Sequence, residues 1–114
     1  MAEHFLYLTT TGRTTGQARK IEIWFVEHGG RYYLVSEHGE RANWVKNIAN
    51  DPNVAFSIGQ REVETDRRPL TPAVARFVDR DDELELVDTI RGLMNKKYNW
   101  SNDLVVELTP YNLT

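Results

Sequence analysis

The stretch 31–54, RYYLVSEHGERANWVKNIANDPNV, carries the signals of a strand, a loop and a helix in direct succession. Its first part, 32–35, is short, apolar and rich in residues that favour strands. The polar loop 36–40 leads into 44–49, where apolar residues recur at the spacing of one helix face. Pro52 ends this helix, because proline cannot continue it and disfavours helical geometry in the preceding residue. Such a connection leaves backbone N–H groups that can bind an anion such as a cofactor phosphate, and an ordinary strand–helix connection is the alternative.

The composition is that of an ordinary globular domain. The chain has 114 residues, of which 40% are hydrophobic and 27% are charged. The formal net charge of −3 gives no indication of nucleic-acid binding, and the lack of cysteine excludes disulfides and thiol nucleophiles. No apolar run reaches the length of a membrane span, and the N-terminus lacks a basic-then-apolar signal pattern. We therefore expect one domain over 1–114, without a transmembrane segment, in the cytoplasm.

Strand signals also lie on both sides of the opening stretch. Within 18–27, every second residue from Ile21 to Phe25 is apolar, which is the pattern of a half-buried strand. The Gly-rich turn 28–30 connects this strand to 31–37 as a hairpin. We expect further strands over 5–9, 53–59 and 104–108, and a charged edge strand over 62–68.

Helix signals follow in the second half of the chain. Thr71 and Pro72 resemble a helix start, with Thr as the cap and Pro at the first helical position. A stronger helix opens at Asp81 and Asp82, and the apolar residues on its predicted face are Leu86, Ile90, Leu93 and Met94. About six strands and two or three helices predict an α+β, mainly β, domain on a mostly antiparallel sheet. We expect this sheet to close into a barrel that covers its edges.

The sequence offers no catalytic apparatus that works without a cofactor. The three histidines have no helical metal-binding spacing and no carboxylate cluster beside them, so we expect no metal site. No serine lies in a G-x-S-x-G setting, and neither a Walker sequence nor a G-x-G-x-x-G after a strand is present. If the protein is an enzyme, a cofactor carries the chemistry and the protein positions it.

The segment 9–19, TTTGRTTGQAR, is the candidate binding segment between two predicted strands. Its glycines allow a ligand to approach the backbone, and its hydroxyl and N–H groups can donate hydrogen bonds. Arg13 and Arg19 can pair with phosphate or carboxylate. A plain hairpin loop is the alternative for this segment, and a core position is the alternative for Trp44 on the predicted helix face.

Five motifs follow one another along the chain: LYLTTTGR at 6–13, GQAR at 16–19, YLVS at 33–36, WVKNI at 44–48 and DPNV at 51–54. In this order they resemble the deazaflavin-dependent nitroreductase family, which belongs to the FMN-binding split barrel superfamily of flavin and deazaflavin oxidoreductases. The resemblance implies a split β-barrel, a homodimer, and the 8-hydroxy-5-deazaflavin coenzyme F-420, with FMN as the alternative cofactor. The implied activity is hydride transfer from the reduced coenzyme to a small hydrophobic acceptor such as a nitroaromatic or a quinone.

The resemblance also implies which residues form the site. Those expected to hold the phosphate and tail of the cofactor are Thr11, Gly12, Arg13, Thr14, Gly16, Gln17 and Arg19. Those expected to line its ring system are Ser36, Gly39, Trp44 and Asn47. The acceptor pocket is expected at Tyr98 and Trp100, whose alternative role is to pack the end of the long helix.

Departures from the family pattern favour a second hypothesis. Thr14 replaces a lysine that often follows the Gly-Arg pair, and Glu37 and Glu40 bring negative charge near an anionic cofactor. These departures favour a split-barrel protein that binds a flavin, haem or apolar ligand without turnover. A purely structural dimer module is a third hypothesis, and it requires the segment 9–19 to bind nothing.

Overall fold

The computed structural model describes residues 5–36, 41–59, 70–79, 81–98 and 104–111, without the side chains of 96–98. The predicted edge strand 62–68 lies outside these residues. The described elements, in chain order, are β1 (Phe5–Thr11), β2 (Ala18–Ile23), β3 (Phe25–His28), β4 (Arg31–Ser36), α1 (Asn43–Asn50), β5 (Asn53–Gly59), β6 (Thr71–Phe77), α2 (Leu84–Tyr98) and β7 (Leu104–Pro110).

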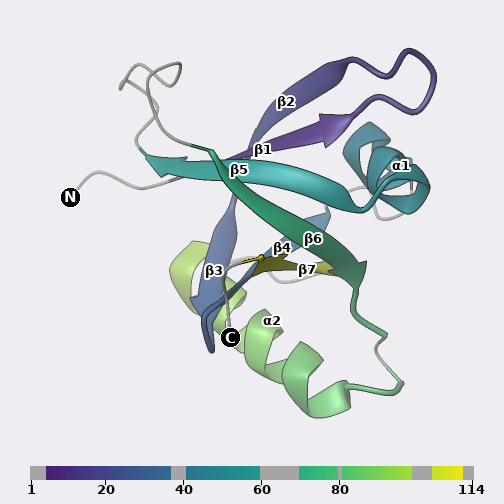
Figure 1. Ribbon diagram of the computed structural model, residues 1–114. Helices are drawn as coiled ribbons and strands as arrows, with labels where there is room; N and C mark the ends of the chain where they lie inside the picture. Colours follow the sequence, from purple (N-terminus) through teal and green to yellow (C-terminus); the bar gives the residue numbers. More distant parts are fainter. Residues whose placement is uncertain (1–4, 37–40, 60–69, 80, 99–103, 112–114) are drawn as a thin grey trace.

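All the described strands belong to one antiparallel sheet with the order β2-β1-β5-β6-β7-β4-β3. The two strands at the ends of this order, β2 and β3, are consecutive in the chain and are separated only by Trp24. The sheet therefore curls until its two ends meet at this residue. In Figure 1, β6 runs from the group of β1, β2 and β5 to the group of β3, β4 and β7. This topology confirms the predicted split β-barrel on a mostly antiparallel sheet.

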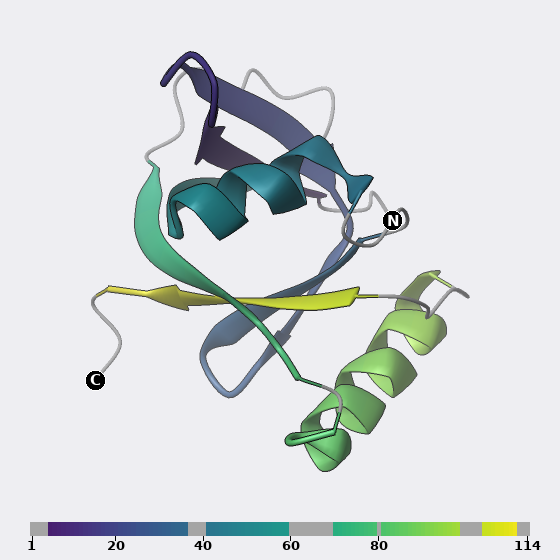
Figure 2. The same cartoon turned by 90° about the vertical axis from the view of Figure 1, so that its right-hand side faces the viewer.

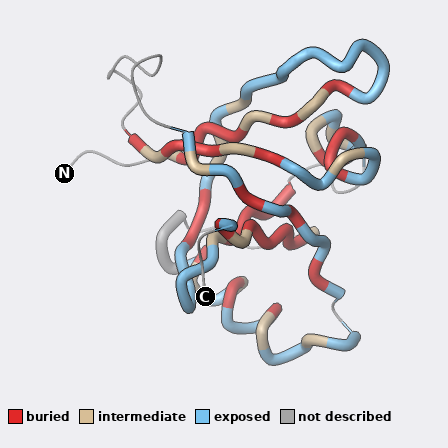
Figure 3. The backbone as a smooth tube through the Cα atoms, viewed as in Figure 1, coloured by how far each residue is buried: buried red, intermediate tan, exposed pale blue. Residues whose placement is uncertain are grey.

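One face of the curled sheet packs the main core. Leu6 on β1 and Leu34 on β4 are fully buried in it. The alternation predicted for 18–27 is confirmed, because Ile21 and Phe25 both pack on this face. Figure 3 shows buried positions running along the central strands, whereas the end of the β1–β2 hairpin is exposed.

The two helices cover different parts of the sheet. α2 packs on the opposite face, where Val35 and Val105 form a second core with Ile90 and Met94. The helix face predicted for α2 is confirmed, since Ile90 and Met94 are both fully buried. α1 buries Val45, Asn47 and Ile48, and packs against β1. Figure 2 shows α1 beside the β1–β2 hairpin and α2 well apart from it, beside the other half of the sheet.

Two predictions of secondary structure are wrong. The single strand predicted over 18–27 is divided at Trp24, because β2 pairs with β1 whereas β3 pairs with β4. The helix start predicted at Thr71 is instead the start of β6, in which Ala73 and Ala75 are buried between exposed neighbours. Its proline is the second residue of the strand, and a strand tolerates proline near its beginning.

A buried carboxylate, that of Glu107, links the sheet to the start of α2. It accepts hydrogen bonds from the Tyr33 hydroxyl at 2.8 Å and from Arg76, which also pairs with Glu83 at 2.6 Å. Burial raises the pKa of Glu107, but the hydrogen bonds from Arg76 and Tyr33 lower it more, so the pKa lies below the ordinary 4.5. Burial and the hydrogen bond to Glu107 raise the pKa of Tyr33 to about 12. The hydrogen bonds to Glu83 and Glu107 raise the pKa of Arg76.

Candidate cofactor site

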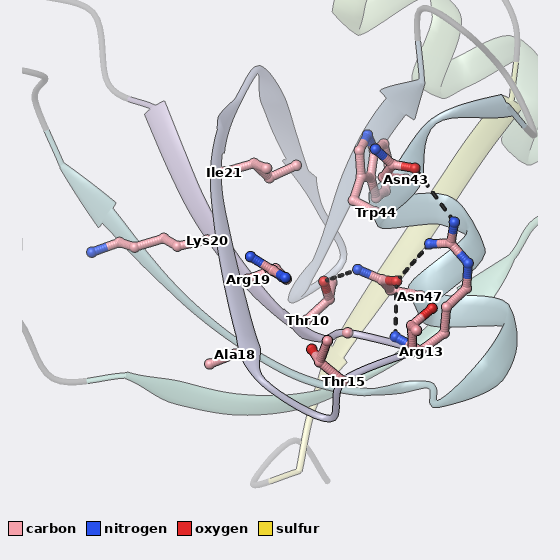
Figure 4. A pocket seen from close by; sticks show the side chains of 12 residues that line it. Thr10, Arg13, Thr15, Ala18, Arg19, Lys20, Ile21, Asn43, Trp44 and Asn47 are labelled. Atoms are coloured by element: carbon pink, nitrogen blue, oxygen red, sulfur yellow. Dashed lines mark hydrogen bonds between the residues drawn. The ribbon is translucent and has the colours of Figure 1, made fainter.

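A pocket of about 580 Å³ lies between the β1–β2 hairpin and α1 (Figure 4). β1 and β2 are consecutive in the chain, whereas α1 is brought to them because the strand that follows it, β5, pairs with β1. Its lining residues are Thr10, Gly12, Arg13, Thr14, Thr15, Ala18, Arg19, Lys20, Ile21, Asn43, Trp44 and Asn47.

The loop between β1 and β2 is closed by its own backbone. The Gly12 N–H donates to the Gln17 carbonyl at 2.8 Å, and the Gly16 N–H donates to the Gly12 carbonyl at 2.8 Å. Gly16 has a φ of 74°, which residues with a side chain rarely adopt. A Cβ on Gly12 would lie 3.1 Å from the Gln17 carbonyl oxygen. Both glycines are therefore needed for a loop this tight.

The Asn47 side chain ties this loop to α1. Its Oδ1 accepts hydrogen bonds from the backbone N–H of Arg13 at 3.2 Å and from Arg13 Nη1 at 2.9 Å. Its Nδ2 donates to Thr10 Oγ1 at 3.1 Å. Asn47 exposes 5% of its surface and Thr10 exposes 2%, so the hydrogen bond between them is buried. The two bonds from the exposed Arg13 are part-buried. These three hydrogen bonds are here called the Asn47 clasp. Arg13 Nη2 lies 3.5 Å from Asn43 Oδ1, one helical turn before Asn47.

The charge that faces the pocket is positive, although the whole chain has a formal net charge of −3. Arg13, Arg19 and Lys20 are among the described residues that line it, and no carboxylate is among them. Arg19 pairs with Thr10 in the sheet and faces the pocket, whereas Lys20 points away from it in Figure 4. The Lys20 ammonium instead lies 5.7 Å from the centre of the Tyr7 ring. Two arginines on one pocket could pair with an anionic ligand.

Two apolar side chains lie on one side of the pocket, where Asn43 lies beside Trp44 in Figure 4. Ile21 and Trp44 lie on one side of the pocket in Figure 4, and Thr15 and Arg13 lie on the other. Both apolar side chains are partly buried and pack against the main core, so the core holds them in place. A ligand with a flat apolar part and an anionic tail fits this division, because each part meets a surface of matching character.

The sequence-predicted site residues fall into three groups. Those that line the pocket are Gly12, Arg13, Thr14, Arg19, Trp44 and Asn47. Those that do not line it are Thr11, Gly16 and Gln17, in or beside the same loop, and Ser36, which is 1% exposed at the end of β4. Gly39 and Trp100 lie outside the described residues, and Tyr98 is the last residue of α2, with its side chain outside the description.

Several lining residues were not among the site residues predicted individually. Thr10, Thr15 and Ala18 lie within the candidate binding segment 9–19, whereas Lys20, Ile21 and Asn43 lie outside it. The sequence carries a signal for two of them. Asn43 and Asn47 are four residues apart and share a helix face, and Thr10 has the same parity as the buried Leu6 and Leu8 on β1.

No group of three His, Cys, Asp or Glu side chains in the described residues could hold a metal ion. Neither described helix is both long enough and apolar enough to cross a membrane.

The fold has solved counterparts at low sequence identity. An F-420-H2 dependent reductase (FDR-A) superposes with a TM-score of 0.58 at 20% identity, over 91% of this chain and 92% of that one. The haem storage protein HutZ from Vibrio cholerae superposes with a TM-score of 0.69 at 21% identity, over 96% and 82%. A structure described as a domain-swapped dimer has a TM-score of 0.57 at 18% identity, over 95% and 81%. These similarities establish the fold.

A family model goes further than the fold. The model described as F-420H(2)-dependent quinone reductase matches residues 1–98 of this chain. The match includes the β1–β2 loop, α1 and every described residue that lines the pocket. The chain therefore belongs to the F-420H(2)-dependent quinone reductase family, and it is an oxidoreductase that uses the deazaflavin coenzyme F-420.

Proposed function

We propose that the pocket between the β1–β2 hairpin and α1 is where this oxidoreductase holds F-420. The observation that supports this most directly is the pair of arginines, Arg13 and Arg19, in a lining without a carboxylate among the described residues. In a chain of negative net charge, such a local excess of positive charge favours a ligand that carries phosphate.

The hairpin end of the pocket would bind the phosphate and tail. Arg19 supplies the charge from β2, and the Thr14 and Thr15 hydroxyls supply further hydrogen bonds. Gly12 allows the ligand to approach the backbone closely. Thr11, Gly16 and Gln17, which were expected to touch the tail, act in this proposal by shaping the loop.

The apolar side would hold the ring system against Ile21 and Trp44. When bound, the reduced coenzyme supplies the hydride for reduction of the acceptor. The protein's own contribution is to bind the ring, orient one of its faces and exclude water with the Trp44 side chain. We infer that the acceptor is a quinone or a nitroaromatic, in keeping with the name of the matching family.

We further propose that residues 1–114 act as one domain in a cytoplasmic homodimer. The domain-swapped dimer among the structural neighbours supports the dimer. Exposed apolar side chains on and beside β6 also support it, since Leu70 is 52% and Val74 36% exposed. Light scattering on purified protein measures this directly, and a monomer at micromolar concentration would refute the dimer.

Titration of ligand-free protein with F-420 and with FMN, followed by fluorescence, tests the site. We expect F-420 to bind at micromolar concentration and FMN to bind more weakly. Preference for FMN would refute the assignment of this pocket to F-420, and binding of neither would favour the non-catalytic alternative. Reoxidation of reduced F-420 by quinones and by nitroaromatics, followed by absorbance, then tests the acceptor class. Reoxidation by neither class would refute that part of the proposal.

A further inference from the structure

The Asn47 carboxamide has little capacity left for a ligand. A carboxamide offers two acceptor positions on oxygen and two N–H donors on nitrogen. Arg13 occupies both acceptor positions, with its backbone N–H at 3.2 Å and its guanidinium at 2.9 Å. Thr10 takes one donor at 3.1 Å. Since Asn47 is also only 5% exposed, its side chain faces its protein partners and not the open pocket.

The group that orients Arg13 is a neutral carboxamide, that of Asn47, and this neutrality matters for the charge of Arg13. Arg13 is an exposed residue whose hydrogen bonds to Asn47 are part-buried. A carboxylate that oriented such an arginine would also offset its charge. Arg13 is oriented here by neutral amides, those of Asn47 and Asn43, so its positive charge remains available to a ligand. Its guanidinium has five N–H donors, and the two amides engage only part of them.

We propose that Asn47 is a positioning residue and not a cofactor contact: it holds the Arg13 guanidinium at the rim of the pocket without neutralising its charge. The same side chain fixes the loop through the Arg13 backbone and fixes α1 to β1 through Thr10. An anion then meets a guanidinium whose conformational freedom is already restricted, which lowers the cost of binding. The identity of the ligand rests on the proposed function, whereas the orienting role rests on the clasp itself.

The first test is a double-mutant cycle on F-420 binding. Asn47→Ala removes the acceptor that orients Arg13 without adding a charge, whereas Asn47→Asp keeps an acceptor for Arg13 and adds the charge that the clasp avoids. We expect Asn47→Ala, Asn47→Asp and Arg13→Ala each to weaken F-420 binding roughly tenfold, a common cost of losing an orienting partner. The double variant Asn47→Ala/Arg13→Ala should bind no more weakly than Arg13→Ala alone, because residue 47 then has no guanidinium to place. Effects that multiply would show that Asn47 touches the cofactor itself, and would overturn the proposal.

A matched control separates positioning from general stability. Asn50→Ala changes the same residue type at an exposed position at the end of the same helix. We expect it to leave both F-420 binding and the melting temperature unchanged. Asn47→Asp should lose affinity while its melting temperature stays within a few degrees of the wild type. If the loss of F-420 affinity in Asn47→Asp were fully explained by a smaller fraction of folded protein, the proposal would also be overturned.

The second test needs no ligand. In the wild type, the Arg13 amide hydrogen is bonded to Asn47 Oδ1, so its exchange with solvent should be slow. Asn47→Ala should speed exchange at this amide while Ile21 in the adjoining strand stays protected. Unchanged protection of Arg13 would overturn the proposal even if F-420 fails to bind the wild type. Failure of the wild type to bind F-420, with the exchange effect present, would instead refute the proposed function and leave the clasp established.

Discussion

Arg76 donates to both carboxylate oxygens of Glu107, from Nε to Oε1 and from Nη2 to Oε2, each over 3.1 Å. Such a two-point contact fixes orientation as well as distance. Because Arg76 also pairs with Glu83 just before α2, this contact joins β6 and β7 to the start of the helix.

Glu107→Gln should lower the free energy of unfolding by about 1–3 kcal/mol, since donors from Arg76 and Tyr33 lose a charged acceptor at a buried position. Urea unfolding measures the change. Glu85→Gln, at an exposed position in the first turn of α2, is the matched control and should change stability by no more than about 0.5 kcal/mol. Equal effects of the two substitutions would contradict the structural role of Glu107.

Stability should fall in acid partly through Glu107. Its pKa in the folded protein lies below the ordinary 4.5, because the hydrogen bonds from Arg76 and Tyr33 outweigh the effect of burial. The unfolded chain therefore binds the proton more tightly, so the stabilisation is complete above pH 4.5 and is lost as the pH falls through the folded-state pKa. The difference in melting temperature between the wild type and Glu107→Gln should shrink below pH 4.5. A difference that stays constant would contradict this.

The contribution of Tyr33 to stability should be lost as the pH rises, whereas that of Glu107 is lost as the pH falls. Burial and the Glu107 carboxylate raise its pKa from 10.0 to about 12 in the folded protein. The hydroxyl's contribution is therefore complete below pH 10 and is lost as the pH rises towards 12. The stability difference between the wild type and Tyr33→Phe should narrow across this interval, as denaturation curves at several pH values would reveal. The chain has five tyrosines, so the phenolate of Tyr33 is read as the difference in absorbance between the wild type and Tyr33→Phe. A difference that titrates near pH 10 in the folded protein would contradict the shift.

Two glycine substitutions should have opposite effects on stability. Gly16→Ala should destabilise the protein by about 1–2 kcal/mol, because its φ of 74° is in the left-handed region. Gly92→Ala should stabilise it by about 0.5–1 kcal/mol, because Gly92 lies within α2 and a Cβ there meets nothing within 4 Å. Thermal unfolding measures both, and the same sign for both would contradict the loop geometry.

Arg19 and Lys20 are neighbouring cations on β2, and they should contribute differently to the affinity for F-420. Arg19→Ala should weaken F-420 binding by roughly tenfold or more, as expected for the loss of a charge-assisted hydrogen bond. Lys20→Ala should have a much smaller effect, because Lys20 points away from the pocket towards Tyr7. Fluorescence titration in matched buffer compares the two. Equal losses would indicate that net charge alone, and not the facing of the side chain, governs binding.

The sequence could predict what depends on local pattern. The helix at α2 and the alternation across Ile21 and Phe25 follow from periodicity, and the structure has both. The division at Trp24 could not be predicted, since it reflects a change of pairing partner between distant strands. Thr71 was assigned to a helix because a Thr-Pro pair is a local cap signal, whereas pairing with β5 and β7 decides its strand.

The candidate site also has residues that could be predicted from local sequence and residues that could not. The Gly-Arg loop and the Trp44 and Asn47 positions were predicted from motifs, and they line the same pocket. Thr10 and Ile21 were not predicted individually as site residues, because their place in the pocket depends on how the β1–β2 hairpin packs beside α1. The role of Asn47 towards Arg13 and Thr10 depends on hydrogen bonds across 34 and 37 positions of sequence, which no local pattern records.

The order of the sheet also bears on how the protein resists aggregation. Among the described strands, only β2 and β3 have a single neighbour, and unpaired strand edges are templates for pairing with other chains. Because these two strands are consecutive, both edges fall on one run of chain, 18–28. Its exposed side chains include Arg19, Glu27 and His28. The fold thus places both unpaired strand edges on one polar segment of the chain, where a few charged side chains can protect both edges from pairing with strands of other molecules.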